Sequence, residues 1–137
     1  MIAGGKFSKV FAQINNSQDE GIIHLGYITD GQLRALYENA VAFIFPSLYE
    51  GFGLPPLEAM VCGCPVISSN RASLPEVCGD AALYFDPTNL SDIRSKIQQL
   101  VNKPATREMF KEKGALRAQS FTWERAAQSL LPILSDT

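Results

Sequence analysis

Histidine and cysteine, the residues that supply many metal ligands and nucleophiles, are scarce in this sequence. The 137 residues include one histidine and three cysteines, Cys62, Cys64 and Cys78. An odd number of cysteines in a chain that is neither short nor rich in cysteine argues against a disulfide framework. Cys62 and Cys64 stand close together, but a zinc site needs about four ligands and His24 is distant in sequence. We therefore predict buried thiols and no metal site.

Long apolar runs and blocks of one charge are also lacking. No apolar stretch approaches the roughly 20 residues that span a bilayer, and the N-terminus lacks the charged-then-apolar pattern of a secretion signal. The net charge is −2, with no run of lysine or arginine, which argues against nucleic acid or an anionic membrane as a partner. Hydrophobic residues make up 46% of the chain and charged residues 19%, the balance of a folded soluble domain. These features predict one cytoplasmic domain.

The most informative stretch runs from residue 41 to residue 63. An apolar run at residues 41–45 is closed by Pro46, which is typical of a buried strand. Residues 55–62 are typical of a short helix, because proline is tolerated in the first turn and Gly63 is well placed to end it. The loop between them contains two glycines. A strand, a glycine-bearing loop and a helix start form a site for an anion such as phosphate.

Two prolines limit which groups could hold that phosphate. Pro55 and Pro56 have no N–H group and cannot donate a hydrogen bond. The amides that remain at the helix start are those of Phe52, Gly53, Leu54 and Leu57.

Two acids, Glu50 and Glu58, flank the predicted anion site. An ionised carboxylate only accepts hydrogen bonds, so its natural partners here are hydroxyl groups, such as those of a sugar. Phosphate together with several hydroxyls describes a sugar nucleotide. The alternative is that Glu58 is only a favourable charge in the first turn of a helix and that Glu50 is a solvated loop residue.

The segment Glu50-Gly51-Phe52-Gly53-Leu54-Pro55-Pro56-Leu57-Glu58 resembles the E-x7-E signature of retaining GT-B glycosyltransferases of the glycogen-synthase-like family 4 group. The similarity covers nearly the whole chain in the right order. It includes Leu25-Gly26-Tyr27, Phe45-Pro46-Ser47, Gly63-Cys64-Pro65-Val66-Ile67, Leu74-Pro75-Glu76-Val77 and Phe121-Thr122-Trp123-Glu124.

The resemblance implies a set of roles in a C-terminal donor-binding domain, of which residues 1–137 would be a part. Glu50 would be the catalytic residue, whose carboxylate accepts hydrogen bonds from hydroxyls of the donor sugar, and Glu58 would bind the ribose. The backbone near Tyr27 and Ile28 would contact the base. The substrate would be a nucleotide-diphosphate sugar, with no metal and no cofactor. The sugar and its distal phosphate would be held by the backbone of Gly51, Phe52, Gly53 and Leu54.

Strands alternate with helices along the chain, which predicts an α/β fold with a Rossmann-like, mostly parallel sheet and flanking helices. The resemblance implies that the first strand–helix unit of the domain is missing here. In the strand order 3-2-1-4-5-6 that first strand is central, so the strand at residues 41–45 would lack a neighbour. The missing segment would also carry the arginine and lysine that neutralise the pyrophosphate. The rest of the sheet could come from a longer protein, a partner chain or a second copy.

Other local patterns predict helices and their buried faces. Thr29 to Gln32 fits a capping box, and Thr122 fits the cap of a last helix. Arg71 follows a strand at residues 65–68, where we favour a solvated loop arginine over a phosphate partner. Helical spacing is seen at Phe7, Val10, Phe11 and Ile14, at Ile93, Ile97, Leu100 and Val101, and at Met109, Phe110, Lys113 and Leu116.

The sequence therefore predicts the donor-binding portion of a retaining glycosyltransferase. The acceptor, a glycan, a lipid or a small molecule, would bind an N-terminal domain that this sequence lacks, and that domain could also place the protein at the inner membrane face. The alternative is a non-catalytic subunit that binds a nucleotide sugar and needs another chain for activity. A third hypothesis is an interaction domain that has lost the site.

Overall fold

The computed structural model describes residues 1–3 and 21–135, which fall into two compact units, residues 1–35 and 36–137. In the first unit, β1 (Ile2–Ala3) pairs in parallel with β2 (His24–Gly26). His24 is exposed at the start of β2, opposite Ile2. The helix predicted from Phe7 to Ile14 lies outside the described residues.

Helix α1 (Asp30–Asn39) starts with the predicted capping box. The side-chain oxygen of Gln32 accepts a hydrogen bond from the Thr29 amide at 2.9 Å, and the Gln32 amide donates to the Thr29 hydroxyl at 3.4 Å. Each side chain thus accepts a hydrogen bond from the backbone amide of the other residue, at the end of the helix where amides lack intrahelical partners.

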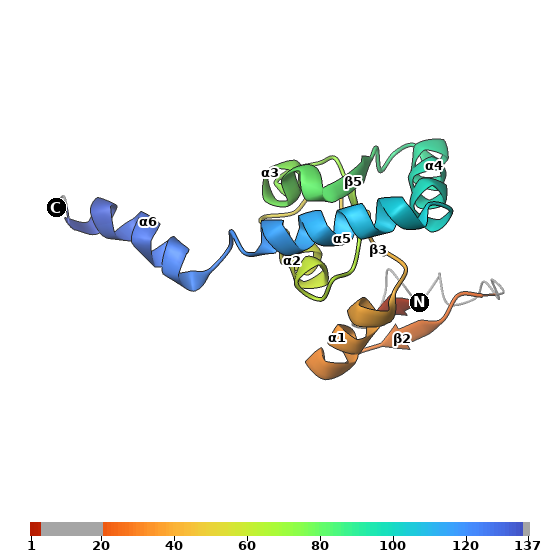
Figure 1. Cartoon of the computed structure of the whole chain (residues 1–137), viewed down its shortest axis with the longest axis horizontal. Helices are drawn as coiled ribbons and strands as arrows, with labels where there is room; N and C mark the ends of the chain where they lie inside the picture. The colour runs from red at the N-terminus through yellow and green to blue at the C-terminus, as the bar shows by residue number, and fades with distance from the viewer. Residues whose placement is uncertain (4–20, 136–137) are drawn as a thin grey trace. The chain divides into compact units, whose positions relative to one another are not determined.

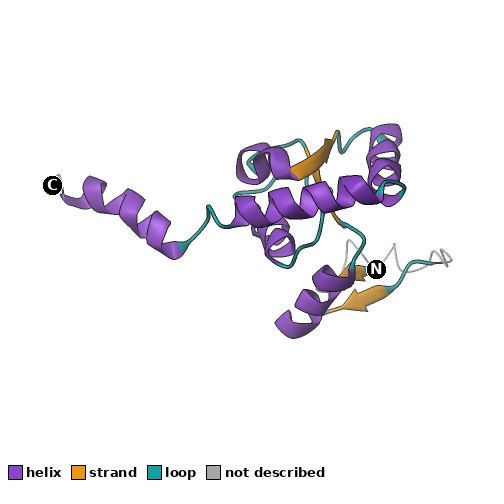
Figure 2. Cartoon of the chain, viewed as in Figure 1, coloured by secondary structure: helices purple, strands orange, loops and turns teal. Residues whose placement is uncertain are grey.

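The second unit contains a parallel sheet with the strand order β3-β4-β5 (Figure 1). The strands are β3 (Phe43–Phe45), β4 (Val66–Ser69) and β5 (Ala82–Phe85). The helices are α2 (Leu54–Val61), α3 (Leu74–Cys78) with the 3₁₀ turn η2 (Gly79–Ala81), α4 (Leu90–Val101), α5 (Pro104–Ala118) and α6 (Trp123–Ser135). Strands and helices alternate along this part of the chain (Figure 2), so the predicted α/β fold is confirmed.

The central strand β4 and the edge strand β3 differ in burial and in the number of strands that pair with them. All four residues of β4 are buried, as expected of a central strand that is covered on both faces. Within the described residues, β3 pairs with β4 on one side only. The backbone groups on the other side of β3 have no strand partner in the described part of the chain. The residues of β3 are half-buried or exposed, so a strand forms in the predicted stretch, but the prediction that it is buried is wrong.

The core of the second unit lies between the sheet and helices α4 and α5. Ile67 and Phe85 come from the sheet, Leu100 from α4 and Phe110 from α5, and Ile93 and Ile97 pack against this cluster. The buried stripe predicted on α4 is therefore correct for Ile93, Ile97 and Leu100. It is wrong for Val101, the last residue of the helix, which is 47% exposed.

The buried face of α5 differs from the one predicted from its large apolar residues. Met109 and Leu116 are exposed, and the buried positions are Phe110, Gly114 and Ala118. The reason is a close approach to α2, because a Cβ atom on Gly114 would lie 3.1 Å from Met60 Cγ. The small residues Gly114 and Ala118, four positions apart, leave room for α2 to pack closely against this face of α5.

Helix α2 ends as its sequence predicts. Gly63 has a φ of 71°, in the left-handed region that glycine adopts without a steric penalty. Its amide donates to Met60 O at 3.0 Å, and the Cys64 amide donates to Ala59 O at 2.9 Å. This pair of hydrogen bonds is a Schellman motif, which turns the chain from α2 toward β4.

Candidate functional site at the carboxyl ends of the strands

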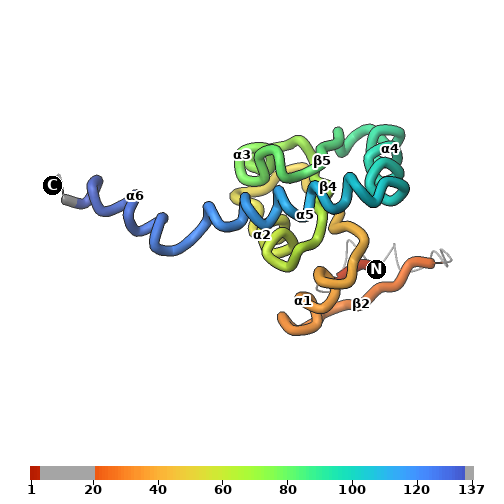
Figure 3. The backbone as a smooth tube through the Cα atoms, in the orientation of Figure 1, coloured from red at the N-terminus to blue at the C-terminus, as the bar shows by residue number. Residues whose placement is uncertain are grey.

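Three loops follow the carboxyl ends of β3, β4 and β5, the edge at which parallel α/β sheets bind ligands (Figure 3). Side-chain hydroxyls connect these loops to one another. The Ser69 hydroxyl at the end of β4 donates to Ser47 O in the loop after β3, at 2.5 Å. The Asn70 amide donates to Phe85 O at 3.0 Å, which extends the pairing of β4 with β5.

The loop after β3 reaches α2 through Gly53, whose backbone only glycine adopts readily. Gly53 is the N-cap of α2, with φ 110° and ψ 44°. It is also buried, and a Cβ atom there would lie 3.0 Å from Leu74 Cδ2. Both the backbone angle and the lack of space require glycine at this position.

The carbonyl groups of this loop are held from α3. The Ser73 hydroxyl lies 2.9 Å from Glu50 O and 2.8 Å from Phe52 O. Within the described residues, no oxygen accepts a hydrogen bond from the amides of Gly51, Phe52, Gly53 or Leu54. These four N–H groups, which include three of the four that the sequence singles out for phosphate, therefore have no hydrogen-bond partner in this part of the chain. Gly51, Phe52 and Leu54 are exposed, whereas Gly53 is buried.

Helix α2 begins at Leu54, one residue earlier than predicted, and this changes the position of Glu58. Its first turn contains no acidic residue. Glu58 is the fifth residue of the helix and lies in the second turn, because a turn takes 3.6 residues. The alternative role as a first-turn charge is therefore wrong, since the dipole effect fades within that turn.

The two acids differ in their surroundings. Glu58 is exposed, and Glu50 is half-buried. Within the described residues, neither carboxylate accepts a hydrogen bond or forms an ion pair. Burial raises the pKa of Tyr37 to about 12, and the negative charge of Glu58 adds to this rise.

A second contact holds the loop through the side chain of Phe52. Its ring meets the Phe121 ring edge to face, with centroids 5.8 Å apart. The guanidinium of Arg117 lies 5.0 Å from the centroid of the Phe121 ring, a cation–π distance. Arg117 in turn donates to Val77 O at 2.8 Å and to Glu76 O, at the end of α3.

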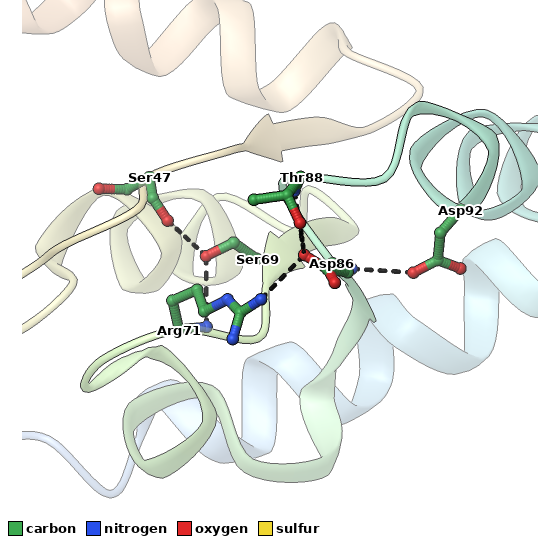
Figure 4. A network of polar contacts seen from close by, with 6 residues as sticks. All are labelled: Ser47, Ser69, Arg71, Asp86, Thr88 and Asp92. Atoms are coloured by element: carbon green, nitrogen blue, oxygen red, sulfur yellow. Dashed lines mark hydrogen bonds and ion pairs between the residues drawn. The ribbon is translucent and has the colours of Figure 1, made fainter.

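Arg71 belongs to a polar network rather than to an open cationic site (Figure 4). Its guanidinium pairs with the Asp86 carboxylate at 3.0 Å, and both side chains are partly exposed. The same carboxylate oxygen accepts hydrogen bonds from Thr88, and the Asp86 amide donates to Asp92. Hydrogen bonds from Thr88, assisted by Arg71, hold the pKa of Asp86 below its usual value. The favoured interpretation of Arg71 as a loop residue thus holds, with Asp86 as its partner.

The remaining predicted ligand residues lie elsewhere. Tyr27 is exposed and Ile28 half-buried, and both belong to the first unit, so their predicted contact with a base stays a prediction. Cys64 and Cys78 are buried thiols, as expected, and Cys62 is half-buried. No group of three or more potential metal ligands occurs among the described residues. None of the helices described combines the length and apolar character of a membrane span.

Sequence reasoning did not identify Ser73 or Arg117 as parts of this region. Ser73 stands just before a helix, where a serine is usually interpreted as a cap. Arg117 lies at the end of α5, where a basic residue is favoured by the helix dipole alone. Phe121 stands out in the sequence only as part of the segment that resembles the family.

Comparison with known proteins is consistent with this arrangement. A family model described as glycosyl transferases group 1 matches residues 1–117. O-antigen chain mannosyltransferase B of Escherichia coli is 48% identical over 103 residues, which are 75% of this chain and 27% of that protein. The chain therefore spans about a quarter of the length of this relative.

Solved structures give the same picture. A sucrose-phosphate synthase of Thermosynechococcus elongatus matches with a TM-score of 0.76 and 28% identity, over 93% of this chain and 33% of that one. The C-terminal domain of a glycosyl transferase group 1 family protein of Francisella tularensis matches with a TM-score of 0.66 and 26% identity, over 80% of this chain and 57% of that domain's chain.

The chain belongs to the glycosyl transferase group 1 family. The resemblance to GT-B glycosyltransferases is confirmed, and the fold is that of their C-terminal domains. Retention of configuration, the nucleotide-sugar donor and the roles of individual residues stay predictions.

Proposed function

We propose that this chain forms part of the donor-binding domain of a retaining glycosyltransferase, which transfers a sugar from a nucleotide-diphosphate sugar to an acceptor. One observation carries the proposal. The amides of Gly51 to Leu54 have no hydrogen-bond partner among the described residues, and they lie at the start of α2, between Glu50 and Glu58 in the sequence. Because the relative from Escherichia coli is named a mannosyltransferase, mannose is the first donor sugar to test.

The chemistry of each group fits a role at this site. The open amides would hold the sugar and the distal phosphate, because N–H groups at a helix start favour anions. Glu50 is the candidate catalytic residue, since its carboxylate would accept hydrogen bonds from sugar hydroxyls. Glu58 would do the same for the ribose. As the bond to the sugar breaks, the leaving diphosphate gains charge, and amides already aimed at it would stabilise the transition state.

The free edge of β3 bears on the alternative function. The residues of β3 are half-buried or exposed, and an uncovered strand edge presents unpaired N–H and C=O groups with which another strand can pair. We infer that a strand from the rest of the protein, or from a partner chain, pairs with β3. If this chain acts with a separate partner, the non-catalytic nucleotide-sugar-binding subunit is the function to consider second.

Further parts of the proposal concern substrate, cofactor and location. The acceptor, a glycan, a lipid or a small molecule, would bind outside these 137 residues. The reaction would need no metal ion and no cofactor, so a chelator should leave donor binding unchanged. The protein would work in the cytoplasm or at the inner face of the membrane.

Isothermal titration calorimetry with GDP-, UDP- and ADP-linked sugars, together with a transfer and donor-hydrolysis assay, tests the proposed function. Binding together with transfer supports the glycosyltransferase. Binding without transfer or hydrolysis, even with the partner present, favours the binding subunit. No binding to any nucleotide contradicts both and favours a domain that has lost the site.

A further inference from the structure

Ser73 occupies a helix N-cap position but does not cap its helix. Serines at this position usually accept a hydrogen bond from an amide in the first turn, and the Ser73 side chain makes no such bond. Its hydroxyl instead points to two carbonyls of the loop after β3, Glu50 O at 2.9 Å and Phe52 O at 2.8 Å. The serine therefore holds a loop more than 20 residues away.

The backbone just before Ser73 is shaped for this contact. Ala72 has a φ of 51°, the only residue other than glycine with a positive φ among the described residues. A left-handed backbone is unfavourable for alanine, because its Cβ atom comes too close to the following carbonyl oxygen. Such strain persists only where the surrounding contacts require it, and it is concentrated at functional sites. The turn at Ala72 brings Ser73 to the loop carbonyls.

Holding a carbonyl also fixes the direction of the next amide. In a trans peptide unit the C=O of one residue and the N–H of the next point in opposite directions, and no cis peptide bond occurs among the described residues. With Glu50 O and Phe52 O directed at Ser73, the N–H groups of Gly51 and Gly53 point away from it. These are two of the amides without a hydrogen-bond partner in the proposed donor site.

The aromatic contact restrains the same peptide segment from its side chain. Phe52 lies between the amides of Gly51 and Gly53 in sequence, and its ring rests against Phe121. The Arg117 guanidinium makes a cation–π contact with the Phe121 ring and donates hydrogen bonds to carbonyls at the end of α3. The loop is thus restrained at its backbone by the Ser73 hydroxyl and at the Phe52 side chain by the Phe121 ring.

We propose that Ser73 and Phe121 are positioning residues that keep the N–H groups of Gly51 and Gly53 aimed at the diphosphate of the donor. The proposal rests on the proposed function, since it names what orders that site. Neither residue needs to touch the donor, because both act through the loop.

The first test compares Ser73→Ala with Ser73→Thr in the full chain. Amide ¹⁵N relaxation without ligand should show order parameters at Gly51 and Gly53 falling from about 0.85 to below about 0.6 in Ser73→Ala. Ser73→Thr keeps the hydroxyl and should restore them. Ser129→Ala is the matched control, because Ser129 also donates to a backbone carbonyl, that of Arg125 at 2.9 Å.

The second test measures affinity in the same variants, with inorganic pyrophosphate and the nucleotide sugars as probes. Ser73→Ala should weaken both by about tenfold, the effect of losing the alignment of one or two hydrogen bonds. Phe121→Leu should weaken them as well, while Trp123→Leu, at an exposed aromatic nearby in sequence, should not.

The two readouts separate the failure of this inference from the failure of the proposed function. Unchanged order parameters in folded Ser73→Ala and Phe121→Leu overturn the inference, whatever the affinities. A mobile loop with undiminished affinity for pyrophosphate overturns it too, because the amides would then need no alignment. If the wild-type chain binds none of the probes, the proposed function fails, and the restraint is judged on the order parameters alone.

Discussion

Gly53 and Leu74 are so close that a Cβ atom on Gly53 would stand 3.0 Å from Leu74 Cδ2. Leu74 is fully buried as the first residue of α3, so it has no room to withdraw. The contact joins the start of α2 to the start of α3. It makes the loop after β3 part of the packed core at one end, although its other residues are exposed or half-buried.

We expect Gly53→Ala to be strongly unfavourable for both stability and binding. The substitution combines a clash with Leu74 and a φ of 110°, which alanine avoids. Together they should lower the free energy of unfolding by about 2–4 kcal/mol, measured by urea denaturation. Gly51→Ala is the matched control, because nothing lies within 4 Å of a Cβ there. Equal losses in both variants would contradict the packing explanation.

The two acids should differ in the ligand they recognise. Glu58→Ala should weaken the binding of nucleotide sugar and of bare nucleotide alike, by about 1.5–3 kcal/mol, because charged hydrogen bonds to the ribose are lost. Glu50→Ala should weaken nucleotide-sugar binding more than nucleotide binding. Calorimetry with both ligands checks this, and Glu112→Ala on the exposed side of α5 is the control. Equal losses for both ligands in Glu50→Ala would refute its assignment to the sugar.

The crossing of α5 over α2 should tolerate only small residues at Gly114. A leucine there must displace Met60, which is 1% exposed and packed at the crossing. We expect Gly114→Leu to lower the free energy of unfolding by about 1–3 kcal/mol, as overpacked cores do. Leu116→Ala, at a residue that is 67% exposed, should change it by less than about 0.5 kcal/mol. Thermal denaturation of the two variants distinguishes these outcomes.

Stability should fall at alkaline pH because of the buried thiols. Burial raises the pKa of Cys64 and of Cys78 from 9.0 to about 11 in each case. Between pH 9 and pH 11 the unfolded chain therefore releases protons that the folded chain keeps, which favours unfolding. Ionisation of these thiols should therefore leave the denaturation midpoint unchanged below about pH 9 and should lower the midpoint above that pH.

The pH profile of a double variant, Cys64→Ala with Cys78→Ala, tests the cause. The variant should be less stable at neutral pH, because cavities replace the thiols, but its decline between about pH 9 and pH 10 should be shallower. Above about pH 10 the raised pKa of Tyr37, about 12, adds a further decline in both proteins. An unchanged slope in the double variant would assign the decline to other groups.

Features with local causes could be predicted from the sequence. The capping box at Thr29, the left-handed turn at Gly63 and the cap at Thr122 each depend on neighbouring atoms. The Thr122 hydroxyl accepts the expected hydrogen bond from the Arg125 amide at 3.2 Å. The same holds for the alternation of strands and helices, because the period of apolar residues reports the faces that are buried.

Features that depend on distant contacts could not be predicted. The buried face of α5 follows from the approach of Met60, which favours Gly114 over the larger Met109 and Leu116. Ser73 has the sequence signature of a cap, and only the folded chain shows that its hydroxyl serves a loop. Glu50 and Glu58 are flanking acids in the sequence and in the structure, and their roles stay predictions until a donor is bound.

The loop after β3 is held at its backbone oxygens. Ser69 binds the carbonyl of Ser47, and Ser73 binds those of Glu50 and Phe52. Every residue type has a carbonyl, so replacing Ser47 or Glu50 leaves these anchors in place. In the proposed donor site, the side chains of this loop can therefore be exchanged while the contacts to its backbone stay, which makes the loop a natural place to redesign donor choice.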